Sequence, residues 1–214
     1  MRPSYVIYMN LNKDLHPPQI PVFTFIYGCA IGIEKLLYKE LEVISQLAEI
    51  LQSEFPQAKL MVRPYPNYKS WEVYNSLLKH DNILLDNNFR EGDQSVKDSE
   101  ILKKFETIQN AKAFFHLGTT LGLEACFTDC PSFILDLDYQ RNSKFNLNTF
   151  VYQFQNKKYI IDQSPLNTIK SEFQLREIIS DQDQSKYLKF NQLIRSQYPL
   201  KSFREIADQI STFA

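Results

Sequence analysis

Two hydroxyls and a glycine follow a short apolar run within residues 113–138, and this stretch holds the residues best placed for chemistry. Residues 113–117 are apolar or aromatic except for His116. Gly118, Thr119 and Thr120 interrupt the run, and residues 121–127 have helical spacing. Residues 132–135, which follow a proline, are typical of a second buried strand. The order strand, tight turn, helix, strand predicts a βαβ unit with its turn at the carboxyl edge of a sheet.

This turn can bind an anion. Backbone N–H groups and the positive end of a helix meet at such an edge, and glycine lets the backbone come close to a phosphate. The hydroxyls of Thr119 and Thr120 can add donors. Glu124, about one helical turn further on, can accept two hydrogen bonds from the cis-diol of a ribose. The alternative is that Thr119 or Thr120 is an ordinary N-cap and that Glu124 is a solvated acid in the first turn.

Two further side chains are predicted at ends of strands. Residues 60–62 form a strand that Arg63-Pro64-Tyr65-Pro66 stops, which places Arg63 on the ligand edge of the sheet. Its guanidinium can hold a phosphate bidentately, or it can form a structural salt bridge with a carboxylate. His116 can reach a donor phosphate or base, or it can be a hydrogen-bonded histidine at the end of its strand.

The remaining pattern supplies the elements that would position these residues. Apolar residues recur at helical period over residues 33–55 and again over residues 99–108, and each stretch predicts an amphipathic helix. Strands are predicted at residues 4–9 and 83–86, with residues 10–30 as a long loop that an apolar run at 22–27 interrupts. After residue 137 we expect a polar loop over 138–149, a hairpin within 150–161 and a mostly helical tail from Pro165.

The sequence HLGTTLGLEACFTDCPSFIL at residues 116–135, together with KLMVRPYPNY at residues 59–68, resembles the donor-binding, carboxyl-terminal half of GT-B glycosyltransferases. The resemblance is to bacterial surface-carbohydrate and capsule enzymes and to polyglycerol-phosphate transferases. In those families a strand ending in Arg-Pro-His-Pro precedes the Gly-Thr/Ser-Thr/Ser turn and its Leu-Glu-Ala helix. This chain has Tyr65 in place of that histidine, so no role of the imidazole carries over.

The resemblance implies an α/β, Rossmann-like fold with a mostly parallel, five- to six-stranded sheet, helices on both faces and a helical C-terminal tail. Residues 1–164 would be the nucleotide-sugar-binding domain, and residues 165–214 the tail packed on it. It also implies metal-independent transfer from a nucleotide-activated sugar or polyol. Arg63, His116 and the turn of Gly118, Thr119 and Thr120 would contact the donor, with Glu124 on the ribose. The catalytic base would come from an N-terminal acceptor domain or a partner chain.

The amino-acid composition argues against several classes of function. With 24 basic and 25 acidic residues in 214, the chain has no electrostatic footprint for nucleic acid. Three cysteines form no even framework, and no apolar run is long enough to span a bilayer. We therefore expect free thiols and a cytoplasmic protein, or one peripheral at the inner membrane. The three histidines have no metal-ligand spacing, so we expect no metal site. Motifs of zinc hydrolases, dinucleotide oxidoreductases, kinase-type NTPases and serine hydrolases are missing, and we expect no other cofactor.

Two other functions stay open at the level of sequence. One is a nucleotide-sugar epimerase or other hydrolase of the same architecture, which would release nucleotide diphosphate without an acceptor. The other is a non-catalytic subunit derived from the donor half, which would dock on a partner that bears the other domain. Such a subunit would keep the apolar tail and lose its affinity for the donor.

Overall fold

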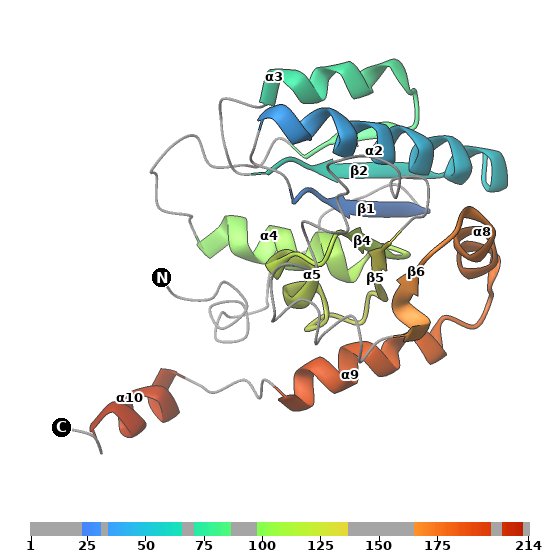
Figure 1. The fold of residues 1–214 in the computed structure, drawn as a ribbon. Helices are drawn as coiled ribbons and strands as arrows, with labels where there is room; N and C mark the ends of the chain where they lie inside the picture. The colour runs from blue at the N-terminus through green and yellow to red at the C-terminus, as the bar shows by residue number, and fades with distance from the viewer. Residues whose placement is uncertain are drawn as a thin grey trace.

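Six parallel strands form a single sheet in the computed structural model, which describes residues 23–30, 34–65, 71–86, 98–136, 165–197 and 203–211 (Figure 1). The strand order is β3-β2-β1-β4-β5-β6, and each neighbouring pair is parallel. The predicted α/β, Rossmann-like fold is confirmed, because this order is that of a doubly wound sheet. The strands are β1 (Thr24–Gly28), β2 (Lys59–Arg63), β3 (Ile83–Leu85), β4 (Phe114–His116), β5 (Ser132–Leu135) and β6 (Thr168–Ile169).

Helices connect these strands, and the helices predicted over residues 33–55 and 99–108 are confirmed as α2 and α4. The α-helices are α2 (Glu34–Glu54), α3 (Trp71–Tyr74), α4 (Asp98–Gln109), α5 (Thr120–Ala125), α8 (Glu172–Ser180), α9 (Leu188–Gln197) and α10 (Phe203–Ser211). Short 3₁₀ helices are η2 (Asn75–Lys79), η4 (Pro165–Asn167) and η5 (Ser185–Tyr187).

The sheet is covered on both faces, as its apolar strands require. Neighbouring residues of a strand point to opposite faces, and in β1 both kinds are buried. Phe25 and Tyr27 belong to a large cluster that includes side chains of α2, α8 and α9. Ile26 belongs to a second cluster with Ile108 of α4 and Ala125 of α5. Figure 1 shows α4 and α5 together, away from α2 and α3.

The loop predicted over residues 10–30 is wrong where the structure describes it, because residues 24–28 form β1, with two strands on one side and three on the other. All five residues of β1 are buried. A strand buried on both faces loses the alternation of polar and apolar residues that identifies a half-exposed strand. The strand predicted at residues 4–9 lies outside the described residues, as do the predicted loop at 138–149 and the hairpin within 150–161.

The stretch predicted as a helical tail is mostly helical, and it also contributes the edge strand β6. Thr168 and Ile169 pair with Ile134 and Leu135 of β5. The buried side-chain amide of Asn167 donates to the carbonyl of Ser132 at 2.9 Å and to that of Tyr187 at 3.0 Å. β6 is therefore part of the sheet, and α8 and α9 share its core. Among the described helices, none is both long enough and apolar enough to cross a membrane.

Candidate functional site

The strand order changes direction between β1 and β4. From β1 the chain moves outward to β2 and β3, and then returns to place β4 on the other side of β1. In doubly wound sheets, ligands bind outside the carboxyl ends of the strands at such a switch point. Gly28 and His116 end these two strands and are paired across the junction. Arg63 ends β2 beside them, so three strand ends meet where the sequence predicts a ligand.

The predicted turn follows β4 and is closed by its own hydrogen bonds. The N–H groups of Gly118 and Thr119 donate to Nδ1 of His116, at 2.9 and 3.1 Å. Thr119 is the N-cap of α5, and its hydroxyl accepts from the N–H of Gly122 at 3.1 Å. Gly118 has φ of 72°, in the left-handed region that favours glycine. The N-cap interpretation of Thr119 is thus confirmed, while Thr120 is an exposed first residue of the helix.

His116 is fully buried, and its ring holds the turn in place through these two hydrogen bonds. A nitrogen that accepts hydrogen bonds carries no proton, so the proton of the neutral ring is on Nε2. A Cβ built at Gly122 would lie 2.2 Å from Nδ1 and Cε1 of this ring. Glycine inside α5 therefore makes room for the imidazole, and the two residues set the turn together. This arrangement corresponds to the alternative of a hydrogen-bonded histidine at the end of its strand.

Arg63 forms a buried ion pair with Asp86, the residue after β3. Nη1 lies 2.5 Å from Oδ2, and the two side chains are only 6% and 4% exposed. Burial lowers the pKa of the Arg63 guanidinium, and the negative charges of Asp86 and Glu124 oppose that shift. The structural ion pair that the sequence left open is therefore present. A guanidinium has five N–H donors, so one carboxylate does not preclude a phosphate contact.

Glu124 is held by a lysine that the sequence analysis did not single out. Nζ of Lys104 on α4 lies 2.8 Å from Oε2 of Glu124, and the two side chains are 15% and 13% exposed. The same amine lies 4.5 Å from the centroid of the Phe105 ring. Glu124 is therefore a paired, mostly buried carboxylate and differs from the solvated acid of the alternative interpretation.

Gly28 lies between Arg63 and His116 in one row across β2, β1 and β4. Paired residues of neighbouring strands point to the same face, so the two side chains flank a position without one. A Cβ at Gly28 would lie 2.7 Å from Cζ of Phe114 and 3.3 Å from Cδ2 of Leu121. Glycine is required here because α5 and β4 pack tightly against β1 beside the candidate site.

A buried carboxylate on α2 fixes the chain that leaves β1. Oε1 of Glu40 accepts from the hydroxyl of Tyr27 at 3.1 Å and from the N–H of Ala30 at 2.7 Å. Burial raises the pKa of the adjacent Cys29 thiol, and the charge of Glu40 raises it further. Glu40 was missed because its position in the apolar stripe of a long helix resembles that of any other core residue.

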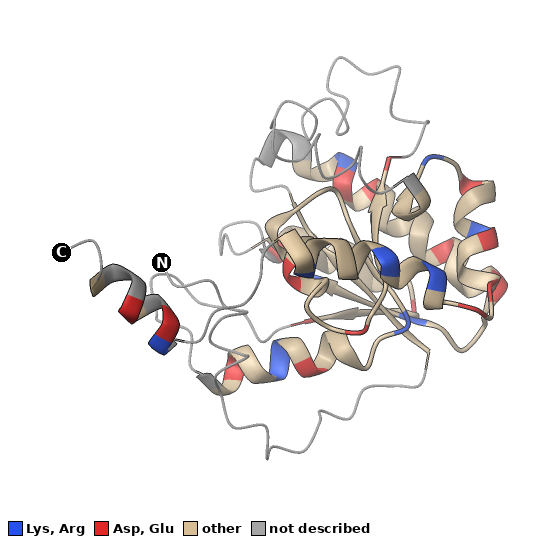
Figure 2. Ribbon diagram, turned by 90° about the horizontal axis from the view of Figure 1, so that it is seen from below, with Lys and Arg blue, Asp and Glu red and all other residues tan. Residues whose placement is uncertain are grey.

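Basic and acidic residues are interspersed along the described helices, as Figure 2 shows. Within the described part of the chain, no group of three or more histidine, cysteine, aspartate or glutamate side chains is arranged to hold a metal ion. The site is therefore defined by two ion pairs, Arg63 with Asp86 and Lys104 with Glu124, and by the turn after β4.

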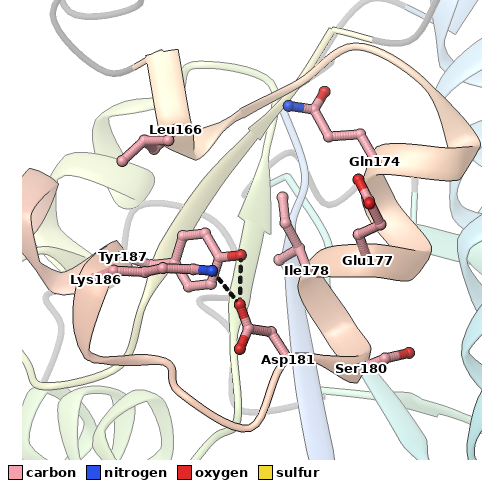
Figure 3. Close-up of a pocket in the computed structure, with 8 residues that line it drawn as sticks. All are labelled: Leu166, Gln174, Glu177, Ile178, Ser180, Asp181, Lys186 and Tyr187. Carbon is pink, nitrogen blue, oxygen red and sulfur yellow. Dashed lines mark hydrogen bonds and ion pairs between the residues drawn. The ribbon is translucent and has the colours of Figure 1, made fainter.

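A cavity of about 480 Å³ lies elsewhere, between α8, η4 and η5 (Figure 3). Asp181, which lines it, accepts from the hydroxyl of Tyr187 at 3.1 Å and is paired with Lys186. The hydrogen bond from Lys186 is the largest cause that lowers the pKa of Asp181. These polar groups satisfy one another, and no predicted site residue lines the cavity. Its lining residues are Leu166, Gln174, Glu177, Ile178, Ser180, Asp181, Lys186 and Tyr187.

Comparison with known proteins assigns no family to this chain. No model of a protein family matches the sequence, and no curated protein matches it either.

Proposed function

We propose that this chain binds a nucleotide-activated sugar or polyol at the carboxyl edge of its sheet, as the donor half of a GT-B-type glycosyltransferase of surface-polysaccharide synthesis. One observation carries the proposal. A buried guanidinium, Arg63, ends β2 next to the switch point of the sheet, and a paired carboxylate, Glu124, lies on α5, the helix that follows β4. A diphosphate needs a cation and a ribose diol needs an acceptor, and these two groups supply both.

In the proposed complex Arg63 holds the diphosphate and stabilises the charge that develops on the leaving phosphate. Asp86 keeps the guanidinium oriented, since the two side chains form a buried pair. The role of the turn differs from the one that the sequence suggests. The N–H groups of Gly118 and Thr119 already donate to His116, so we assign them to the shape of the site and assign the phosphate to Arg63.

Binding is the property to test first, because the resemblance places the catalytic base on another domain. Thermal unfolding should be measured with uridine, cytidine and guanosine diphosphate, for the wild type, Arg63→Gln and Glu124→Gln. A ligand at about 100 times its dissociation constant adds roughly 2.7 kcal/mol of stability. For a domain of this size that corresponds to a rise in Tm of roughly 5–10 °C.

We expect one of the three nucleotides to raise Tm of the wild type, and both substitutions to abolish the rise. Glu49→Gln, which changes an exposed glutamate on α2, is the matched control and should keep the full rise. If the folded wild type shows no shift with any of the three, the isolated chain is not a donor-binding half.

A further inference from the structure

The chain that leaves β2 after Arg63 is held by a buried hydroxyl on α3. The hydroxyl of Tyr74, a residue with no exposed surface, accepts from the N–H of Tyr65 at 3.3 Å. Tyr65 lies two residues beyond Arg63 and is 38% exposed. The bond therefore joins the core to the surface and fixes the direction in which the chain continues from the end of the strand.

The backbone of Arg63 is also held from the neighbouring strand. Its carbonyl accepts from the N–H of Cys29, the residue after β1, at 3.0 Å. The next N–H along that chain, at Ala30, donates to the buried carboxylate of Glu40 at 2.7 Å. The main chain at Arg63 is thus fixed through the segment after β1 on one side and through the bond to Tyr74 on the other.

This support matters because the proposed function assigns the diphosphate to Arg63. The position of a guanidinium depends on its backbone as well as on the partner of its tip, and Asp86 holds only the tip. A binding group that is ordered before the ligand arrives loses less conformational entropy when the ligand binds. Without the Tyr74 hydroxyl, the N–H of Tyr65 would lack this acceptor and the chain next to Arg63 would be less ordered.

We propose that Tyr74 is a positioning residue of the donor site, which holds the backbone of Arg63 where its guanidinium contacts the diphosphate. This inference rests on the proposed function. Tyr74 need not touch the ligand, because its effect passes through Tyr65 to Arg63. A tyrosine that only stabilised the fold would weaken the binding of nucleoside and nucleotide by the same factor, whereas a positioning tyrosine weakens the contribution of the diphosphate.

The test compares the dissociation constants of uridine, cytidine and guanosine diphosphates with those of the corresponding nucleosides, for the wild type and Tyr74→Phe. Calorimetry measures the nucleotides, and displacement of a bound nucleotide measures the weaker nucleosides. The diphosphate should make the preferred nucleotide bind the wild type about tenfold or more tightly than its nucleoside. Tyr74→Phe should reduce that ratio by about three- to tenfold and leave the affinity for the nucleoside within about twofold of the wild type.

Tyr187→Phe is the matched control, because it removes the hydroxyl of another buried tyrosine, which donates to Asp181 at 3.1 Å beside the separate cavity. Each substitution should lower Tm by roughly 2–4 °C, but Tyr187→Phe should keep the wild-type ratio. If Tyr74→Phe keeps that ratio too, or if both variants lower it equally, this inference alone is overturned. If the wild type binds no nucleotide, or binds it no better than the nucleoside, the proposed function fails and this inference fails with it.

Discussion

At the scale of single residues, the contact of Gly122 with the imidazole of His116 has a consequence that runs against the usual rule. Replacing a glycine inside a helix by alanine normally stabilises a protein by up to about 1 kcal/mol. Here the added methyl would lie 2.2 Å from the ring, so Gly122→Ala must displace His116 and break its two hydrogen bonds. We expect a loss of about 2–4 kcal/mol in the free energy of unfolding, measured by urea denaturation.

A double-mutant cycle separates the clash from other effects. In a His116→Ala background the added methyl at Gly122 meets no ring, so its cost should nearly disappear. Equal costs in the two backgrounds would mean that the imidazole is not what Gly122 accommodates.

The partners of the predicted site residues could not be inferred from the sequence. Arg63 follows a predicted strand and Glu124 follows a predicted turn, which indicated a charged edge of the sheet. The structure places Arg63 at the end of β2 and Glu124 on α5, the helix after β4. Asp86 and Lys104 lie on other elements, and one sequence alone does not reveal which residues of separate elements meet. Asp86 carried a faint signal, because it follows an apolar strand directly.

At the scale of elements, α9 is anchored to the turn after α5 by two side chains. The side-chain amide of Asn191, which is 1% exposed, donates to the carbonyls of Thr128 at 3.1 Å and Cys130 at 2.7 Å. Nε of Arg195 donates to the carbonyl of Cys126 at 2.7 Å. Asn191→Ala leaves two carbonyls without this donor and should cost about 2–3 kcal/mol in the free energy of unfolding, as measured by urea denaturation.

Gln192→Ala is the matched control for that prediction, because Gln192 is the exposed neighbour on the same helix. It should change the free energy of unfolding by less than about 0.5 kcal/mol. If both variants unfold at the same urea concentration as the wild type, α9 does not depend on the amide for its position.

Helices with a clear period and most strands that form short apolar runs were predicted, whereas β1 and β6 were missed. α2 could be predicted because burial of one helix face leaves an apolar stripe of helical period. β4 could be predicted because burial of a short strand leaves a short apolar run. β1 was placed in a loop because its apolar run at 22–27 follows a proline-rich stretch. β6 has two residues, which is too short for any periodicity, so only its pairing with β5 defines it.

At the scale of the whole molecule, three buried thiols make stability depend on alkaline pH. Burial raises the pKa of Cys126 to about 12 and also raises the pKa values of Cys29 and Cys130. In the unfolded chain these thiols ionise near pH 8.5. Above that pH the unfolded state binds fewer protons than the folded state, so the free energy of unfolding falls as pH rises. Below it the contribution of the thiols is constant.

The expected slope is up to about 1.4 kcal/mol per pH unit for each thiol above about pH 9. Urea denaturation at pH 7, 8, 9 and 10 measures it. Cys130→Ala, which removes one titrating group, should reduce the slope by one thiol's share relative to the wild type. An unchanged slope in that variant would show that the thiol ionises equally in both states.

The strand order also predicts at which stage of folding the candidate site forms. β1, β2 and β3 follow one another in the chain and can associate through short crossovers, and so can β4 and β5. The junction of β1 with β4 joins Ile26 to Phe114, and closing so long a loop costs more conformational entropy. The site lies on that junction, so we expect it to be the last region to form. Any ligand that binds there should therefore report the completed native state rather than an intermediate.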